Sequence, residues 1–393
     1  MTTAQGLNLH IYPAPIVSES RIFRQTLAVA RAGLYRAIEI CGTPAPGLAT
    51  EEPLSDGRLI RRVGAVAKAG GSVLSRIRYQ IAWSAQVYRQ YASSDLHTVN
   101  AHSVAVLPVA ALLARRTGAR LIYDTHELET KTSTSHGLQG RVFALVERML
   151  IRRSDVVFVV NDLIREWYET AYPGVRAVSV VNSPSLTSRG AANDLHATFG
   201  IPTGSRLFVH VGNIVRARHI PDILAAFAQR PDDHVVFLGD GELGGLVDEA
   251  AATHPNIHHH HRIDSDSVVP TLATADVGIC LIEPSCLSYA LALPNKAIEY
   301  TAAGVPFIHN QLPAVRRLLA GGLAELTIDA VDAEFAGVLD GLTDDTIAAA
   351  REQLGHVELP SWDEESARMI DEYRRLAASP ANRRPRARRG DRP

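Results

Sequence analysis

The segment with the most chemistry in this sequence is EPSCLSYALALPNKAIEY, residues 283–300, which runs from a loop into a helix. Pro294 favours a helix start, because proline suits the first turn, and Lys296 follows it closely. The free backbone N–H groups of a helix start bind phosphate, and the lysine can reach the same anion. Glu299 lies three residues further on the same helix face, where a carboxylate can bind a ribose diol. These residues indicate a nucleoside diphosphate site; the alternative is an ordinary helix start with a surface lysine–glutamate pair.

A second candidate segment is VGNIVRARHIPDIL, residues 211–224. Gly212 and Asn213 end an apolar strand, and Arg216 and Arg218 follow before the next helix. Glycine lets a backbone approach a ligand closely, and arginine presents a planar fork that matches a diphosphate. Solvated surface arginines are the alternative, but the position at the carboxyl end of a strand favours ligand binding.

In the first half of the chain, YDTHELETKT places His126 and Glu127 directly after an apolar strand. A histidine there can bind a sugar hydroxyl or transfer a proton. His102 ends another strand, VNAH, and is a companion candidate. The alternative is a structural histidine with its hydrogen bonds satisfied inside the fold.

Other sequence features argue against competing chemistries. His258 to His261 are consecutive, so in a strand they point alternately to opposite faces and cannot converge on one metal ion. We therefore predict no metal site. GDGELGG, residues 239–245, lacks the G-x-G-x-x-G order of dinucleotide-binding dehydrogenases. Neither a phosphate-binding G-x-x-x-x-G-K-[ST] motif nor a G-x-S-x-G nucleophile motif occurs.

Apolar strands that alternate with helices must position these residues. Such a pattern predicts an α/β fold with parallel sheets covered on both faces. It runs through residues 1–188 and restarts after SRGAAND, so we expect domains at 1–188 and 189–360. A helix is predicted over residues 361–379, and the arginine-rich end, residues 380–393, is predicted to be disordered. The predicted strands are LNLHIY, AIEICG, VNAH, LIYDTHE, DVVFVV, AVSVVNSP, RLFVHVGNI, HVVFLGDG, NIHHHH, ADVGICLI and GVPFIH.

Composition limits the class of protein. The 393 residues carry a net charge of −2, and the three cysteines have no metal-ligand spacing, which favours a reducing compartment. No secretory signal is visible, and the longest apolar run, residues 103–114, is too short to cross a bilayer. We expect a cytoplasmic protein.

Residues 57–94 hold seven basic residues and no acid, interleaved with apolar ones, which suits either contact with an anionic membrane or a solvated basic surface. Nucleic acid binding is not expected, because no module for it accompanies the charge.

From about residue 7 to residue 378, the order and spacing of several segments resemble those of family-4 glycosyltransferases of the GT-B fold. The segments that carry the resemblance are LIYDTHEL, RRSDVVFVVNDLI, VVNSP, FVHVGNI, VVFLGDGEL, ADVGICLI, LPNKAIEYTAAGVPFI and SWDEESARMIDEY. The resemblance implies two Rossmann-like domains facing across a cleft, with the C-terminal helix crossing back to the first. It also implies sugar transfer from a nucleotide-sugar to a hydroxyl, with retention of anomeric configuration and without a metal.

The resemblance further implies roles for individual residues. His126, Arg218 and Lys296 are implied to be catalytic. The implied acceptor-side residues in the first domain are Arg21, His102, His126 and Glu127. The implied donor-binding residues in the second domain are Gly212, Asn213, Arg218, Arg262, Ser288, Tyr289, Ala290, Lys296 and Glu299.

We expect no resident cofactor, a UDP- or GDP-sugar as co-substrate, and a polysaccharide or glycolipid precursor as acceptor. The basic stretch 57–94 adds an expected peripheral contact with an anionic membrane at the inner face of the cell membrane.

The chain departs from the common family pattern at three places. Many members have two glutamates, the second at the position of Glu299, but the position of the first, 291, is leucine here. Arg218-His219 occupies the place of a lysine-glycine pair, and PIVSESR replaces a glycine-rich loop. A subset of the family with a PNK-type helix start shows similar departures. Two alternatives stay open at this point: a catalytically silent subunit that binds a partner enzyme, and a nucleotide-sugar epimerase on the same fold.

Overall fold

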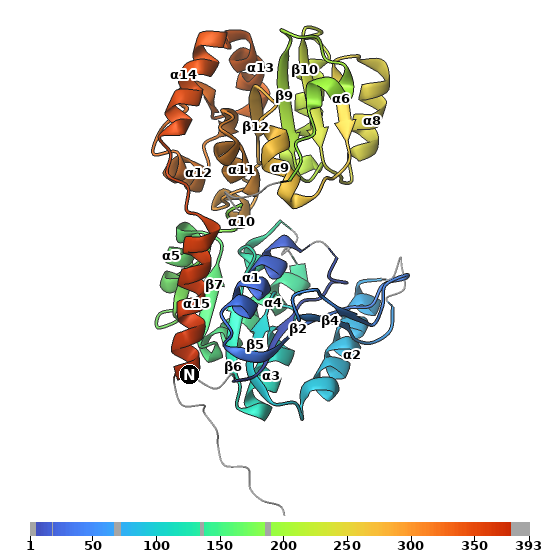
Figure 1. Cartoon of the computed structure of the whole chain (residues 1–393), viewed down its shortest axis with the longest axis vertical. Coiled ribbons are helices and arrows are strands. Elements are labelled where there is room, and N and C mark those ends of the chain that lie inside the picture. The colour runs from blue at the N-terminus through green and yellow to red at the C-terminus, as the bar shows by residue number, and fades with distance from the viewer. Residues whose placement is uncertain (1–4, 18, 67–71, 134–136, 185–189, 379–393) are drawn as a thin grey trace, which may run out of the picture. The chain divides into compact units, whose positions relative to one another are not determined.

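A computed structural model describes residues 5–17, 19–66, 72–133, 137–184 and 190–378. The chain forms two compact units (Figure 1). The first unit contains the chain up to Val180 and again from Ser366, and the second unit runs from Val181 to Glu365. The sequence predicts this division at residue 188, in a segment of which residues 185–189 lie outside the described part. The predicted disordered tail, residues 380–393, also lies outside it.

The first unit is built on an eight-stranded sheet in the order β3-β4-β2-β1-β5-β6-β7-β8. Every neighbouring pair is parallel except β3 and β4. The strands are β1 (Gln5–Ile11), β2 (Tyr35–Gly42), β3 (Glu51–Pro53), β4 (Leu59–Arg62), β5 (Leu96–Ala101), β6 (Arg120–Asp124), β7 (Val156–Val159) and β8 (Ala177–Ser179). β7 is buried along its whole length, as expected for a parallel strand covered on both faces.

Six α-helices belong to the described part of this unit. They are α1 (Ser20–Arg31), α2 (Val73–Tyr91), α3 (Leu107–Thr117), α4 (Gly137–Leu150), α5 (Asp162–Ala171) and, from Ser366 on, α15 (Trp362–Ala378). α1 buries Arg21, Ile22, Gln25 and Val29, which recur at helical spacing. Just beyond its end, Gly33 has a φ of 63°, the left-handed conformation that the sequence predicts for this glycine.

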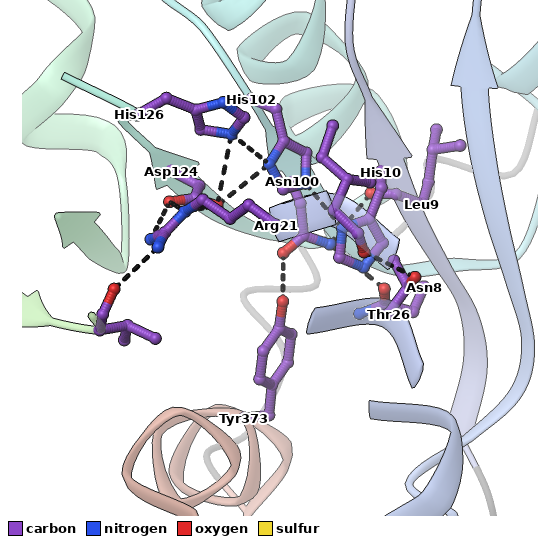
Figure 2. Close-up of polar contacts among 12 residues, drawn as sticks. Asn8, Leu9, His10, Arg21, Thr26, Asn100, His102, Asp124, His126 and Tyr373 are labelled. Atoms are coloured by element: carbon purple, nitrogen blue, oxygen red, sulfur yellow. Dashed lines mark hydrogen bonds and ion pairs between the residues drawn. The ribbon is translucent and has the colours of Figure 1, made fainter. Parts of the chain in front are cut away.

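The C-terminal part of α15 packs on the first unit through polar and aromatic contacts. Tyr373 donates a hydrogen bond to Asn100 Oδ1 at 2.7 Å (Figure 2). Its ring centroid lies 6.0 Å from that of Phe158, and Figure 1 shows α15 beside this unit. Glu372 pairs with Arg176, which precedes β8. These contacts join residues far apart in the sequence, so the last helix completes the first unit.

A buried carboxylate ties α4 to the sheet. Glu147 is fully buried and accepts hydrogen bonds from four hydroxyl groups, two at each oxygen. Tyr123 and Tyr168 donate to Oε1 at 3.0 and 2.8 Å, and Thr130 and Tyr172 donate to Oε2 at 3.0 Å each. A buried carboxylate is tolerated only when its lone pairs are satisfied, and four donors satisfy both oxygens here.

The second unit has a six-stranded, fully parallel sheet in the order β11-β10-β9-β12-β13-β14. Its strands are β9 (Arg206–Val211), β10 (Asp233–Leu238), β11 (Ile257–His260), β12 (Val277–Cys280), β13 (Phe307–Asn310) and β14 (Thr327–Ile328). Its helices are α6 (Leu195–Phe199), α7 (Ile220–Phe227), α8 (Gly244–Thr253), α9 (Ser265–Leu272), α10 (Leu287–Ala290), α11 (Asn295–Ala303), α12 (Pro313–Leu318), α13 (Val331–Gly341) and α14 (Asp344–Gly355). The predicted α/β class with two parallel-sheet domains is confirmed.

Residues 67–71 of the basic stretch 57–94, with Lys68, lie outside the described residues, and two described parts of the stretch have different surroundings. Arg58 and Arg62 are buried, and they pair with Asp56 and Glu52, while Arg61 pairs with Glu39 at 3.0 Å. The sequence count missed these pairs because the acids lie outside the stretch. These three arginines therefore do not form an open basic surface.

α2 is the other part of the stretch, and its exposed side carries apolar residues. Leu74, Ile77 and Ile81 are 58%, 43% and 66% exposed, and their spacing puts them on one helix face. Arg76 and Arg78 on the same helix are exposed. Among the described residues, no helix is both long enough and apolar enough to cross a bilayer.

Candidate functional site

In the second unit, the candidate site forms where β9, β10 and β12 end. Gly212 follows β9 with a φ of 102°, and its N–H donates to Leu238 O at 2.9 Å. A Cβ on Gly239 would lie 2.0 Å from Gly212 O, so the two turns stack backbone on backbone. Glycine is required for this close approach, and it leaves the residues after both turns at one edge of the sheet.

Helix α11 is fastened to this sheet by Tyr300. The Tyr300 hydroxyl donates to Val209 O at 2.8 Å and accepts from the Val211 N–H at 3.1 Å, so it bridges two backbone groups of β9. The ring lies over Gly278 of β12, where an added Cβ would meet three ring carbons at 2.8 Å. Because residues four apart share a helix face, fixing Tyr300 also fixes Lys296 over the sheet.

Lys296 lies in the first turn of α11 and is buried, with 7% of the residue exposed. Its Nζ lies 3.2 Å from Nε2 of His210, a fully buried residue of β9. Burial, together with the nearby Arg218, lowers the pKa of Lys296 to about 7, against the opposing effects of Cys280 and Glu299. Burial, with the lysine beside it, also holds the pKa of His210 well below its ordinary value. The helix begins at Asn295, so Pro294 is its N-cap rather than a residue of its first turn.

Arg218 lies beside the same helix start. It ends the short 3-10 helix η3 (Arg216–Arg218), and its guanidinium carbon is 5.0 Å from the centroid of the Tyr289 ring. Ser288, the neighbour of Tyr289 in α10, is buried, and Ala290 ends that helix. His219 takes a left-handed conformation with a φ of 56°, the conformation that glycine favours at this position of the family pattern. Arg218 lies close enough to Lys296 to act on it electrostatically.

The remaining predicted donor residues lie further out. Glu299 is half-buried on α11, and Asn213 is exposed after Gly212. Arg262 is exposed, follows β11, and its backbone N–H donates to Asp240 Oδ2 at 3.3 Å. These side chains remain accessible, which binding of a ribose or a base requires.

The consecutive histidines point alternately to opposite faces, as the sequence predicts. His258 stacks on His234, whereas His259 and His261 lie on the other face and bind Asp248 and Asp240 at 2.7 and 2.9 Å. His259, His261 and Asp240 are close enough to share a cation, but each is already engaged with a protein partner.

In the first unit, a buried polar cluster joins the carboxyl ends of β1, β5 and β6 (Figure 2). Arg21 of α1 binds Asp124, the last residue of β6, with an N–O distance of 2.7 Å, and donates to Val180 O. His102 Nδ1 lies 3.1 Å from the same carboxylate, and its Nε2 is 2.8 Å from His10 Nδ1. His126 Nε2 lies 3.3 Å from His102 Nδ1. The structure therefore brings together the predicted residues Arg21, His102 and His126.

Electrostatics keep this cluster in a defined protonation state. Burial alone would raise the pKa of Asp124, but Arg21, together with His102, holds that pKa well below its ordinary range. Burial lowers the pKa of His126 to about 3 and that of His10 well below its ordinary value. The group His102, Asp124 and His126 could geometrically hold a metal ion, but the Arg21 guanidinium on the same carboxylate opposes a second cation there.

The hydrogen bonds also assign a tautomer to neutral His126. Because the Asp124 carboxylate can only accept, Nδ1 of His102 carries a proton. His126 Nε2, which faces the same nitrogen, therefore acts as an acceptor, and the proton of neutral His126 lies on Nδ1. His126 is 27% exposed and stacks on Tyr12 with ring centroids 5.5 Å apart. Its chemistry is that of a hydrogen-bond donor rather than a base. Glu127, the next residue, is half-buried, and its backbone carbonyl accepts from Thr125 Oγ1 at 2.6 Å.

Two family patterns match this chain. Residues 21–184 match the glycosyl transferase 4-like domain, and residues 205–345 match the glycosyl transferases group 1. Phosphatidyl-myo-inositol mannosyltransferase of Mycolicibacterium smegmatis is 24% identical over 324 residues, which cover 79% of this chain and 78% of that protein. The chain belongs to the family-4 glycosyltransferases.

Solved structures confirm the GT-B fold of this glycosyltransferase. Sucrose-phosphate synthase from Thermosynechococcus elongatus superimposes with a TM-score of 0.75 at 17% identity, covering 96% of this chain and 100% of that one. Anabaena HepE in complex with UDP and glucose gives a TM-score of 0.66 at 13% identity, covering 94% of this chain and 99% of that one. The family patterns and the glycosyltransferase relatives, together with this fold, make the chain a transferase enzyme.

Three residues of this glycosyltransferase that shape the two clusters were not predicted: His210, Asp124 and His10. Each lies in a strand that is otherwise mostly apolar, at or near its carboxyl end. A polar residue at such a position is a usable signal, because burial there must be compensated by a partner. The sequence does not show which face the residue occupies or which partner it meets.

Proposed function

We propose that this glycosyltransferase uses a nucleoside-diphosphate sugar as donor and transfers the sugar to a hydroxyl acceptor with retention of configuration and without a metal ion. The observation that supports this most is the pair of cations at one helix start. Lys296 lies in the first turn of α11, and Arg218 lies within electrostatic range of it. A diphosphate matches two cations and free backbone N–H groups.

The same two residues stabilise the departing diphosphate. As the bond between sugar and phosphate breaks, negative charge grows on the phosphate oxygens, and preorganised cations stabilise this charge most strongly in a partly buried site. Arg218 and Lys296 supply the positive charge that a metal ion supplies elsewhere. The leaving phosphate takes the proton of the acceptor hydroxyl on the same face of the sugar, so the reaction requires no protein nucleophile.

Donor recognition follows from the accessible residues around this pair. The carboxylate of Glu299 accepts hydrogen bonds from the two hydroxyl groups of a ribose, and Arg262 lies at the edge where a base would bind. We propose a UDP- or GDP-sugar; the related fold of HepE is known in complex with UDP and glucose. The Ser288–Ala290 backbone cradles the phosphates.

The acceptor side belongs to the first unit. His126 donates a hydrogen bond from Nδ1–H to an oxygen of the sugar or the acceptor, and the Arg21–Asp124–His102 cluster holds its ring in place. We propose a polysaccharide or glycolipid precursor as acceptor. The mycolicibacterial relative is named for transfer of mannose with phosphatidyl-myo-inositol, which favours a lipid-linked acceptor.

A lipid-linked acceptor requires contact with a membrane surface. We propose that α2 rests on anionic lipid at the inner face of the cell membrane, with Leu74, Ile77 and Ile81 in the headgroup layer and Arg76 and Arg78 on phosphates. Flotation with phosphatidylglycerol vesicles tests this. Replacing Ile77 and Ile81 together by serine should abolish binding, whereas Leu246→Ser, an exposed leucine of the second unit, should not.

Donor binding is tested by thermal shift with UDP, GDP and other nucleotides and their sugar conjugates. A ligand at ~100 times its Kd should stabilise the protein by about 2.7 kcal/mol.

Lys296→Ala and Glu299→Ala should each lower transfer rates at least about tenfold, which corresponds to about 1.4 kcal/mol of transition-state stabilisation. Wild-type rates in both variants would refute the assignment. Conversion of the donor into an isomer when no acceptor is added would support an epimerase instead.

A further inference from the structure

His210 contacts the amine of Lys296, yet neither the sequence pattern nor the proposed reaction assigns it a role. Both residues are buried, and the Lys296 Nζ lies 3.2 Å from His210 Nε2 and 3.4 Å from Nδ1. Within the described part of the chain, Lys296 forms no ion pair with a carboxylate at salt-bridge distance. The lysine is therefore held by a neutral ring rather than by a counter-ion.

The other groups that face Lys296 do not supply that counter-ion. Cys280 of β12 is buried, and burial raises the pKa of its thiol to about 11, so the thiol is uncharged at neutral pH. Arg218 of η3 adds a second positive charge. Glu299, on α11 itself, acts from a half-buried position and only partly offsets the burial of the lysine.

The uncharged ring of His210 beside Lys296 has a consequence for ligand binding. A carboxylate in place of His210 would keep Lys296 charged and would neutralise that charge before any ligand arrives. With a histidine there, Lys296 loses its proton readily in the empty site, because burial disfavours the ammonium form. An arriving diphosphate restores the charged form, since an anion close to the amine favours it. Lysine is much more basic than histidine, so the proton goes to Nζ.

We propose that His210 is a positioning residue for Lys296, and that binding of a nucleoside diphosphate to the second unit is coupled to uptake of one proton by this pair. This inference rests on the proposed function, because it takes Lys296 to contact the diphosphate. The proton comes from solvent, and no covalent bond changes.

The size of the effect follows from the resting state of the lysine. With a pKa of about 7, the empty site takes up about 0.9 proton per diphosphate at pH 8 and about 0.5 at pH 7. The pKa is higher in the complex than in the empty site, so binding is tight at low pH and weakens as pH rises. The Kd should rise roughly 50-fold between pH 7 and pH 9. The terminal phosphates of UDP and GDP have already ionised in this range, because their last pKa is about 6.

The experiment is calorimetry of the whole chain with UDP, GDP and inorganic pyrophosphate at pH 8, in several phosphate-free buffers that differ in ionisation enthalpy. The slope of observed enthalpy against ionisation enthalpy gives the number of protons taken up. We expect a value near 0.9 for UDP or GDP. Pyrophosphate, whose last proton still titrates at this pH, tests binding alone. Binding with a slope near zero would overturn the inference and leave the proposed function intact. Failure of all three probes to bind would overturn both.

Variants separate the two parts of the inference. Lys296→Met should abolish proton uptake, and uptake that persists in this variant would overturn the inference. His210→Asp gives Lys296 a counter-ion, so uptake should fall to near zero. His210→Leu removes the hydrogen bond but keeps the lysine buried, so uptake should persist while the Kd rises roughly three- to tenfold. His309→Asn is the matched control, because His309 is a buried histidine of β13, a strand of the same sheet that β12 separates from β9. Proton uptake by this variant should equal that of the wild type.

Discussion

Replacing Gly278 by alanine tests whether Tyr300 fastens α11, and with it Lys296, to the sheet. The added Cβ would lie 2.8 Å from three carbons of the Tyr300 ring, a distance at which something must move. The ring cannot tilt freely, because its hydroxyl is bonded to backbone groups of Val209 and Val211. Overpacking of this kind costs about 1–3 kcal/mol. If the ring moves, its hydroxyl also loses hydrogen bonds worth about 1 kcal/mol each.

For the second unit, a loss of about 1–3 kcal/mol corresponds to a fall in Tm of roughly 2–12 °C. Differential scanning calorimetry measures this shift. Titration with UDP or GDP should also show weaker binding. Lys296 lies one turn before Tyr300 on the same helix, so a displaced Tyr300 also displaces Lys296. Tyr300→Phe keeps the ring and removes the hydroxyl, so it should lower both Tm and affinity without overpacking.

Gly245→Ala is the matched control. Gly245 is an exposed residue of α8, and an added Cβ there meets no atom within 4 Å. Alanine inside a helix is more stable than glycine by roughly 0.5–1 kcal/mol, so this variant should melt at or above the wild-type temperature. If Gly278→Ala melts with the wild type and binds nucleotide equally well, then Tyr300 does not hold the helix in the way described here.

Two further predictions concern buried carboxylates of the first unit. Glu147→Leu removes the acceptor of four hydroxyl groups, and each buried donor left unsatisfied costs about 1–3 kcal/mol. Urea unfolding should therefore show that the free energy of unfolding falls by at least about 3 kcal/mol. Glu147→Gln should lose less stability, and equal losses in the two variants would contradict the network. For Asp124, the folded pKa is below the unfolded value, so its stabilisation is present above about pH 4 and is lost as pH falls through the folded pKa. The Tm gap between wild type and Asp124→Asn should therefore shrink between pH 7 and pH 3, and a constant gap would show that ionised Asp124 adds no stability.

The order of the elements could be predicted from the sequence, because apolar strands and amphipathic helices are local patterns. RLFVHVGNI predicts β9, and the run into Asn295–Ala303 predicts α11. Residues that follow buried parallel strands meet at one edge of a sheet, so Arg218 and Lys296 could be expected at the same edge. His102 and His126 follow from the same rule. The family resemblance extends these predictions to the GT-B fold.

Charge state and partner choice could not be predicted, because they depend on residues distant in the sequence. His210 contacts Lys296 across 86 positions, and Arg21 contacts Asp124 across 103. The stretch that holds Arg58 and Arg62 contains no acid, yet both pair with acids just outside it. A sequence lists ionisable groups, but only the packed fold decides which lose water and which gain a partner, and these two effects set the pKa of each group.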